Sequence, residues 1–364
     1  MTDILGGGTA AGAGPVGRGG GDKRKEKHRF FETIMKKLNV ALMVGGNSSE
    51  REIALNSAKM VYEAFDKAKY NVFIVDVHGR QWLCDGAGGR KVEVDKTDFS
   101  LHLGEDRLAF DYAFIMIHGT PGEDGKLQGY LEMMGIPYST CDSVSSVETF
   151  DKTLCKRVVA EVEDLCLARE VLIRRGQHPD WQAIVDRLGL PLFVKPNASG
   201  SSCGVTKVKE AARLEEAVEK AFTESDAVLV EEFIAGREFG CGVLLTAEGA
   251  QALPVTEIVA HNEFLDYEAK YTAGKSDEIT PAPIPAETAD RIRRAAVRAA
   301  EACHCRGLVR VDFLLTPDDR IYMIEINSVP GMSSGSIVPK QLAAAGMKLS
   351  DVLDTIIADT LCRH

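Results

Sequence analysis

The sequence predicts a protein of mixed α/β and α+β class. An N-terminal domain with a doubly wound parallel sheet should precede a small central α+β domain and a C-terminal α+β domain. Strand and helix patterns alternate up to about residue 150, which is typical of a parallel sheet covered by helices. After that point the order changes, and the last third contains two strand-like runs joined by a short turn. We expect the domains at 35–150, 151–236 and 237–364.

The N-terminal domain is predicted from short apolar runs separated by turn and helix signals. Strands are expected at 40–44, 71–77 and 112–117. Ser49 and Glu52 have the spacing of a capping box, so a helix should begin there. A second helix follows at 127–134, and Gly135 should end it.

The central and C-terminal domains show a less regular order of elements. Strands are expected at 192–195, 205–208, 227–233 and 238–245. Helices are expected from about 151, at 212–224 and at 286–304, with two more after residue 336. This order does not produce a parallel sheet, and it predicts two α+β domains.

The most informative feature is a predicted antiparallel hairpin whose strands flank the turn at 316–320. Alternation gives each strand a polar and an apolar face. The polar positions are Arg310, Asp312, Glu325 and Asn327. The apolar positions are Val309, Val311, Phe313 and Leu315 in the first strand and Tyr322, Ile324 and Ile326 in the second. If the polar faces meet, their oxygen ligands suit Mg²⁺. A solvated sheet face with a surface ion pair is the alternative.

Composition limits the class of protein. The 364 residues are 45% hydrophobic, and 43 basic against 54 acidic residues give a net charge of −11, which argues against nucleic acid as a partner. We also expect no membrane association, because no apolar run approaches the roughly 18 residues that span a bilayer. Nine scattered cysteines favour reduced thiols and a cytoplasmic location. Residues 1–34 are Gly/Ala-rich and then basic, and we expect a disordered leader there.

Several loops carry groups suited to phosphates. The Gly-Gly turn before the first helix could bind an anion, although this signal is weak by itself. The glycine-rich loop at 200–204 could close over phosphates, but an ordinary hairpin turn is equally compatible. Lys152, Lys195 and Lys270 come from separate elements, and three such lysines would neutralise a triphosphate.

Other polar groups follow strands or begin helices. The apolar strand at 227–233 ends in Glu231 and Glu232, with Glu238 shortly after, and these acceptors suit an adenine amino group and ribose hydroxyls. His118 follows a strand of the N-terminal domain, where open α/β sheets bind ligands. Ser336 precedes a helix whose free N–H groups could bind a carboxylate, and plain capping is the alternative.

Six motifs in this order resemble the D-alanine–D-alanine ligases of the ATP-grasp superfamily. They are Gly-Gly-Asn-Ser-Ser-Glu-Arg-Glu at 45–52, His-Gly-Thr-Pro-Gly-Glu-Asp-Gly at 118–125, Gly-Ser-Ser-Cys-Gly at 200–204, Tyr-Glu-Ala-Lys-Tyr at 267–271, Arg-Val-Asp at 310–312 and Glu-Ile-Asn-Ser-Val-Pro-Gly-Met at 325–332. The resemblance extends from Val40 to Leu361. It implies the ATP-grasp architecture, with ATP held between the central and C-terminal domains.

The resemblance also implies a role for each matching residue. The ATP-binding residues would be Lys152, Lys195, Ser202, Glu231, Glu232, Glu238 and Lys270. Two Mg²⁺ or Mn²⁺ ions would be held by Asp312, Glu325 and Asn327. The first D-alanine would bind near His118, with its ammonium on Glu50. Arg310 and the backbone of Gly331 would stabilise the developing oxyanion. Ser201 and Tyr271 would act with Glu50 in closing the site, and Ser336 and Ile337 would bind the second carboxylate.

The activity that the resemblance implies is ATP-dependent joining of two D-alanines through an acyl phosphate, for peptidoglycan precursors. A homodimer is the family's usual state. Cys203 and Ile337 depart from the common pattern without removing a charged group. A D-alanine–D-lactate ligase is one alternative, although Tyr271 favours an amine acceptor. A nucleotide-binding regulator without turnover is the other alternative.

Overall fold

The computed structural model describes residues 37–85, 91–200, 204–260 and 276–363. Four predicted site residues, Ser201, Ser202, Lys270 and Tyr271, lie outside these ranges, as does the predicted leader at 1–34. The compact unit that contains the remaining site residues spans Leu38–His364. Three sheets form its framework.

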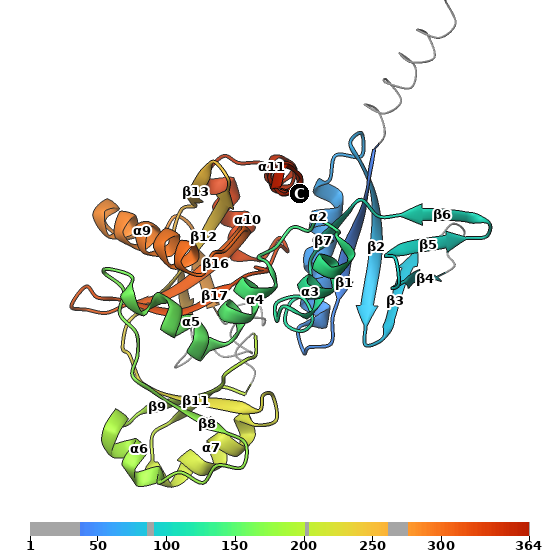
Figure 1. Cartoon of the computed structure of the whole chain (residues 1–364). Helices are drawn as coiled ribbons and strands as arrows, with labels where there is room; N and C mark the ends of the chain where they lie inside the picture. The colour runs from blue at the N-terminus through green and yellow to red at the C-terminus, as the bar shows by residue number, and fades with distance from the viewer. Residues whose placement is uncertain (1–36, 86–90, 201–203, 261–275, 364) are drawn as a thin grey trace, which may run out of the picture. The chain divides into compact units, whose positions relative to one another are not determined.

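The first sheet has seven strands in the order β6-β5-β4-β3-β2-β1-β7 (Figure 1). Its strands are β1 (Leu38–Gly45), β2 (Tyr70–His78), β3 (Gln81–Asp85), β4 (Lys91–Asp95), β5 (Ser100–Leu103), β6 (Asp106–Ala109) and β7 (Tyr112–Ile115). The predicted parallel pairing is confirmed for β2, β1 and β7. The antiparallel strands β3 to β6 extend this sheet and were not predicted.

Four helices belong to this part of the chain: α2 (Arg51–Ala64), α3 (Lys126–Met134), α4 (Ser143–Phe150) and α5 (Lys152–Val158). Gly135 ends α3 as predicted, in the left-handed conformation with φ 65°. The predicted capping box before α2 is wrong. The N-cap residue is Glu50, whose side chain makes no capping bond, and the Glu50 N–H donates to Ser48 Oγ at 3.2 Å. Ser48 in turn donates to His118 O, which ties this turn to the next loop.

The second sheet has four antiparallel strands in the order β10-β9-β11-β8. They are β8 (Glu170–Arg174), β9 (Leu192–Pro196), β10 (Thr206–Val208) and β11 (Ala227–Glu232). The helices α6 (Trp181–Leu188) and α7 (Leu214–Ala221) pack on one face and bury a small core (Figure 1). Lys195 and Glu231 therefore face away from the helices and towards the third sheet.

The third sheet has six strands, with the path β15-β14-β12-β16-β17 and β13 paired to β12. They are β12 (Arg237–Thr246), β13 (Gly249–Ala252), β14 (Thr256–Ala260), β15 (Ser276–Ile279), β16 (Gly307–Leu315) and β17 (Ile321–Asn327). Helix α9 (Ala286–Ala302) covers one face, and α10 (Ile337–Ala344) and α11 (Leu349–Arg363) follow. Alternate residues of β12 enter different cores: Val243 packs in the core that includes α9, and Leu244 in the core of the first sheet.

The hairpin of β16 and β17 is confirmed as antiparallel, but one predicted face is wrong. The register shifts between Asp312 and Phe313, so that Asp312 pairs with Glu325 and Phe313 with Met323. Ile324 is therefore a bulged residue. Because of this extra residue, Tyr322 and Ile324 line a cavity beside Glu325, and only Ile326 of the three enters the core.

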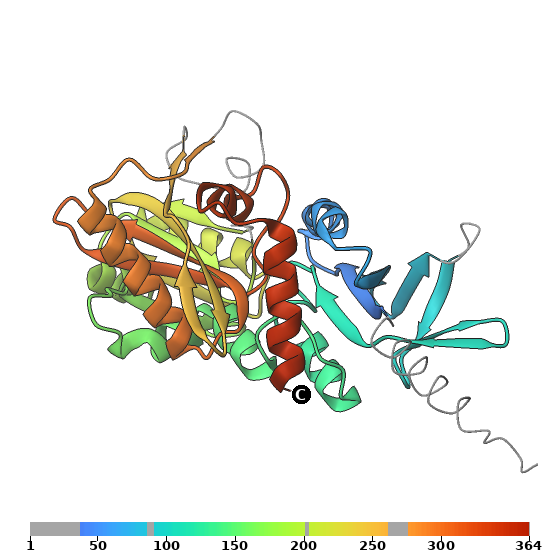
Figure 2. The same ribbon diagram turned by 90° about the horizontal axis from the view of Figure 1, so that it is seen from above.

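Helix α11, the last of the described helices, packs against elements that lie much earlier in the sequence. It contacts α2 and β12 (Figure 2). Tyr70 donates to Asp354 at 2.8 Å and Tyr112 donates to Thr360 at 3.2 Å. The core of the first sheet accordingly includes Leu353 and Ile357 of α11.

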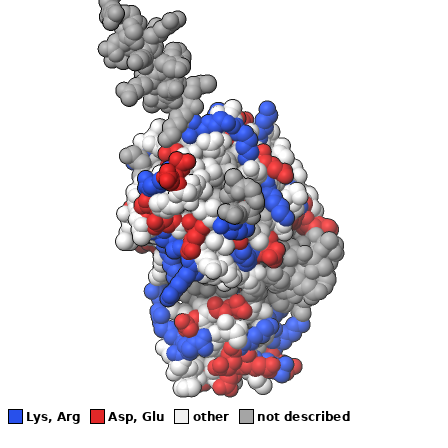
Figure 3. Space-filling view, turned by 90° about the vertical axis from the view of Figure 1, so that its right-hand side faces the viewer, with Lys and Arg blue, Asp and Glu red and all other residues white. Residues whose placement is uncertain are grey.

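The described surface carries charges of both signs. In the face that Figure 3 shows, basic and acidic side chains are interspersed, which is typical of a solvated surface. Among the described helices, none combines the length and the apolar character that crossing a bilayer requires.

Candidate active site

Two adjoining cavities lie along the hairpin. One, of about 430 Å³, lies between the second and third sheets, and we call it the lysine cavity because Lys152 and Lys195 line it. The other, of about 310 Å³, is lined by the hairpin, by the loop that contains His118 and by the start of α10, and we call it the hairpin cavity. Glu238 and Glu325 line both cavities, so that the two spaces meet there.

All the predicted site residues that the structure describes line one or both of these cavities. Those lining the lysine cavity are Lys152, Lys195, Glu231, Glu232 and Glu238. Those lining the hairpin cavity are Glu50, His118, Arg310, Asp312, Glu325, Asn327, Gly331, Ser336 and Ile337. The sequence therefore predicted which residues come together, and their individual roles in binding stay predictions.

The two lysines reach their cavity from different elements. Lys195 lies in β9, and its Nζ is 2.5 Å from Glu231 Oε2. Lys152 begins α5, donates to Ser199 O at 2.8 Å and lies 3.2 Å from Glu325 Oε2. Burial lowers the pKa of Lys195, and the ion pair with Glu231 opposes that shift. Both ammonium groups are thus held by carboxylates at the wall of the cavity.

Glu231 has a role that the sequence did not indicate. Its carboxylate forms a buried ion pair with Lys156 as well as with Lys195. Lys156 also lies 2.8 Å from Glu170. Although burial opposes it, the two lysines lower the pKa of Glu231, which therefore stays ionised. Glu231 is the counterion of both lysines here, and the predicted adenine contact stays a prediction.

The remaining wall of the lysine cavity is suited to a flat, partly polar ligand. Apolar side chains line it, namely Phe193, Phe233, Ile258, Tyr322, Met323 and Ile324. Glu232 is held by Arg169, whose backbone N–H and Nε both donate at 2.7 Å. An apolar slot with a few polar groups at its edge is a common form of small-molecule site.

At the hairpin, the four predicted polar residues lie together. Arg310 forms a bidentate ion pair with Asp312, with N–O distances of 2.7 and 2.8 Å. Asn327 Nδ2 donates to Asp312 Oδ2 at 3.0 Å. Strand pairing places Glu325 opposite Asp312 and Asn327 opposite Arg310. The solvated-face alternative is therefore wrong, because Asp312 is only 2% exposed.

The hairpin cavity has the composition of a cation site. Among its described lining residues, Arg310 is the only lysine or arginine. The carboxyl groups that line it are Glu50, Glu123, Glu238, Glu278, Asp312 and Glu325. This excess of carboxylates, together with the amide of Asn327, suits Mg²⁺ or Mn²⁺, which prefer oxygen ligands.

His118 is buried and acts as a neutral hydrogen-bonding group. Burial lowers its pKa to about 4, and the charge of Arg310 acts in the same direction. One ring nitrogen, Nδ1, lies 2.8 Å from Val329 O, and Nε2 lies 3.1 Å from Ser57 Oγ. A carbonyl oxygen only accepts, so Nδ1 bears the proton and Nε2 accepts from Ser57.

Glu50 is brought to the cavity by the start of α2. Arg51 binds Asp76 at the end of β2 through two contacts of 2.8 Å, which fixes this turn on the sheet. The loop at Gly200 approaches so closely that a Cβ at this position would overlap Glu50 Oε2. Any larger residue at this position would therefore displace the carboxylate of Glu50.

The start of α10 closes the other end of the hairpin cavity. Ser336 is the N-cap of this helix, but its side chain makes no capping bond. Its Oγ instead accepts from the Ser333 N–H at 3.1 Å. The plain-capping alternative is therefore wrong, and the first N–H groups of α10 are left for a ligand.

Sequence reasoning missed Ser57, Glu123 and Lys156. Glu123 stands in the motif at 118–125, and it lines the hairpin cavity with both oxygens bonded. Ser57 is a buried residue of α2, and Lys156 lies one turn after Lys152 in α5. Their partners are distant in the sequence, so alternation and spacing could not reveal them.

Family models match most of the chain. A model described as D-ala D-ala ligase N-terminus matches residues 39–141, and one described as D-ala D-ala ligase C-terminus matches residues 162–358. The chain belongs to the D-alanine–D-alanine ligase family. This finding confirms the predicted resemblance.

Individual members of this ligase family agree with that result. The chain is 43% identical over 321 residues to a D-alanine–D-alanine ligase of Bacteroides fragilis, covering 88% of this chain and 98% of the relative. Among solved structures, the D-Ala:D-Ser ligase VanG of Enterococcus faecalis has a TM-score of 0.78 at 32% identity, covering 89% of this chain and 99% of that one. The ATP complex of the Bacillus anthracis D-alanine–D-alanine ligase has a TM-score of 0.69 at 27% identity, covering 89% and 97%. These likenesses confirm the predicted ATP-grasp architecture.

Proposed function

We propose that the protein joins two D-alanines in an ATP-dependent, ADP-forming reaction that supplies D-alanyl-D-alanine for peptidoglycan. The observation that carries this proposal is the meeting of the lysine cavity and the hairpin cavity at Glu238 and Glu325. A ligase of this kind must bring a polyphosphate and two small zwitterions together. The lysine cavity offers a space for the polyphosphate, and the hairpin cavity offers a space for the two zwitterions.

In the proposed reaction, a carboxylate oxygen of the first D-alanine attacks the γ-phosphorus of ATP, and ADP leaves. Lys152 and Lys195 would screen the repulsion between these anions, because both line the lysine cavity and Lys152 lies 3.2 Å from Glu325, where the cavities meet. The amine of the second D-alanine then attacks the carbonyl carbon of the acyl phosphate. Arg310 and the Gly331 N–H would stabilise the oxyanion of the tetrahedral intermediate, which collapses with loss of inorganic phosphate.

The ammonium and carboxylate groups of the two D-alanines would determine where each binds in the hairpin cavity. The carboxylate of Glu50 would hold the ammonium of the first D-alanine beside the neutral His118. Ser336, through its hydroxyl, and the N–H of Ile337 would receive the carboxylate of the second D-alanine. Asp312, Glu325 and Asn327 would hold two Mg²⁺ or Mn²⁺ ions, which would draw charge from the phosphate oxygens.

A D-alanine–D-lactate ligase and a regulator without turnover remain the rival functions. The decisive experiment measures ADP release from the full chain with D-alanine, L-alanine, D-lactate and D-serine, and identifies the products by mass spectrometry. We expect ADP release with D-alanine alone, D-alanyl-D-alanine as product, and loss of activity when EDTA removes divalent ions. Absence of D-alanine-dependent ADP release would reject the proposal.

We propose further that the protein is a cytoplasmic homodimer, as the resemblance implies. Sedimentation equilibrium at several concentrations tests the assembly, and a monomer at all of them would refute it.

A further inference from the structure

The turn that follows β17 contains Gly331, and residues from the first sheet's part of the chain hold it on both sides. Val329 N–H donates to Glu123 Oε1 at 3.1 Å, and His118 Nδ1 donates to Val329 O at 2.8 Å. On the other side, Met332 N–H donates to Ser57 Oγ at 3.1 Å. Gly331 therefore lies between two anchored residues, and the position of its N–H depends on them.

Glu123 is the residue that joins the two chain segments. Its second oxygen, Oε2, accepts from the Gly119 N–H at 2.7 Å, next to His118. One carboxyl group thus fixes the separation between the His118 loop and the Gly331 turn. Glu123 is only 8% exposed, and its two oxygens each accept from a backbone N–H group.

The chemistry of the side chain suits this bridge. A carboxyl group accepts hydrogen bonds on both oxygens, whereas an amide accepts on one and donates on the other. Burial and the nearby charge of Glu50 raise the pKa of Glu123 to about 8.

We propose that Glu123 is a positioning residue that aligns the Gly331 N–H with the tetrahedral intermediate, with Ser57 as the second anchor of the same turn. The inference rests on the proposed ligase function. It differs from a purely structural role because the bridge should matter more for the transition state than for binding of ATP or D-alanine. An oxyanion donor displaced by about 1 Å loses much of its effect on rate.

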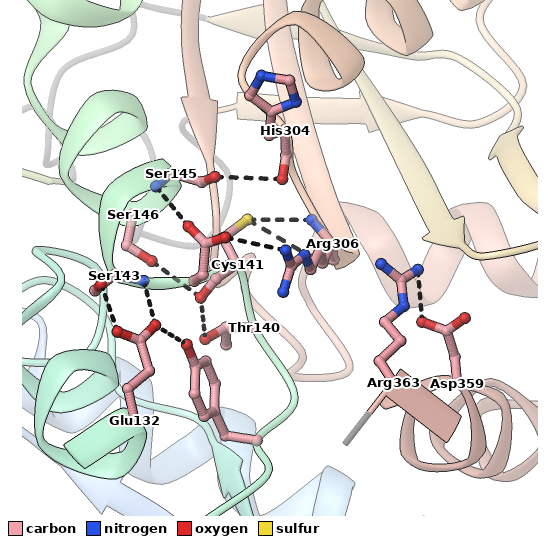
Figure 4. A network of polar contacts seen from close by, with 12 residues as sticks. Glu132, Thr140, Cys141, Ser143, Ser145, Ser146, His304, Arg306, Asp359 and Arg363 are labelled. Carbon is pink, nitrogen blue, oxygen red and sulfur yellow. Dashed lines mark hydrogen bonds and ion pairs between the residues drawn. The ribbon is translucent and has the colours of Figure 1, made fainter. Parts of the chain in front are cut away.

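The test uses Glu123→Gln, which keeps the shape of the side chain but leaves one backbone N–H without an acceptor. Glu132→Gln is the matched control. Glu132 also accepts a backbone N–H, from Ser143 at 2.9 Å, and ties α3 to α4 (Figure 4). It lines none of the cavities described here.

Four quantities are measured in each variant: kcat, KM for ATP, melting temperature, and the Kd of a D-alanyl-D-alanine analogue in which a tetrahedral phosphinate replaces the reacting carbonyl. For Glu123→Gln we expect kcat at least about tenfold lower and phosphinate affinity weakened by a similar factor, with KM for ATP changed less than about twofold. For Glu132→Gln we expect a lower melting temperature with unchanged kcat and phosphinate affinity.

The outcomes separate this inference from the proposed function. If the wild-type chain forms no dipeptide, the proposed function fails and the inference with it. If the wild type is active and Glu123→Gln keeps normal kcat and phosphinate affinity, only the inference is overturned. Should Glu123→Gln not fold, Ser57→Ala removes the other anchor, and normal kcat with normal phosphinate affinity in that variant would overturn the inference.

Discussion

At the scale of single residues, charged side chains of the hairpin cavity are held by ion pairs with oppositely charged neighbours. Arg310 of β16 is fixed by both oxygens of Asp312. Glu325, on the neighbouring strand β17, forms an ion pair with Lys152 of α5. Such bidentate pairs define geometry as well as charge. These contacts therefore fix the positions of Arg310 and Glu325 in the hairpin cavity.

We predict that Glu325→Gln and Arg310→Ala each lower turnover by at least about two orders of magnitude, because each removes a charge that acts on the transition state. The measurement is kcat for D-alanine-dependent ADP release, with circular dichroism to verify the fold. Near-normal rates in both variants would show that the site has been assigned to the wrong residues.

The pKa of Glu123 makes stability depend on pH. Its usual value is 4.5 and burial raises it to about 8, so between these values the folded chain holds a proton that the unfolded chain releases. This group therefore makes the free energy of unfolding fall as pH rises from 4.5 to 8. We predict that the melting temperature of Glu123→Gln declines less across this window than that of the wild type. Parallel declines would contradict the raised pKa.

At the scale of elements, glycine allows two loops to meet. In Gly200→Ala the added Cβ would overlap the Glu50 carboxylate, so that this carboxylate must move from its place in the hairpin cavity. We predict that kcat/KM for D-alanine falls at least about tenfold. Gly129→Ala, within α3, is the control. Its added Cβ would lie 4.0 Å from Ser143 Cβ, which is an ordinary van der Waals contact. That variant should keep full activity and gain about 0.5–1 kcal/mol of stability. Equal activity in both variants would refute the argument.

Elements with a strong local signal could be predicted from the sequence, and those defined by distant partners could not. The alternation of β16 and the glycine after α3 are local features, and both predictions are confirmed. The bulge at Ile324 is invisible to alternation, because a single extra residue in one strand depends on the register of the other. Strands β5 and β6 have four residues each, which is too short for a clear pattern.

The same distinction applies to the candidate site. Most of the charged site residues were predicted, because their types and order in the family motifs appear in the sequence. The pairing of Lys156 with Glu231 joins residues 75 positions apart, and the bond from Val329 to Glu123 spans 206 positions. Only folding reveals these contacts, so Glu231 was expected as an open acceptor and Glu123 was not expected at all.

For the whole molecule, helix α11 joins the two ends of the described chain. We predict that Tyr70→Phe, which removes the bond to Asp354, costs about 0.5–1.5 kcal/mol and lowers the melting temperature by a few degrees. Turnover should not change, because Tyr70 lines neither cavity described here. The measurements are calorimetry and the ADP-release assay. A large loss of turnover with an unchanged melting temperature would contradict a purely stabilising role.

The position of α11 also determines when this chain can finish folding during synthesis. The strands of the first sheet leave the ribosome well before Leu353 and Ile357, which complete its interior. Domains generally fold in the order in which they emerge. Here the strands of the first sheet must wait, with apolar surface uncovered, until α11 has been translated. A nascent chain stalled before α11 would therefore be a natural client for a chaperone.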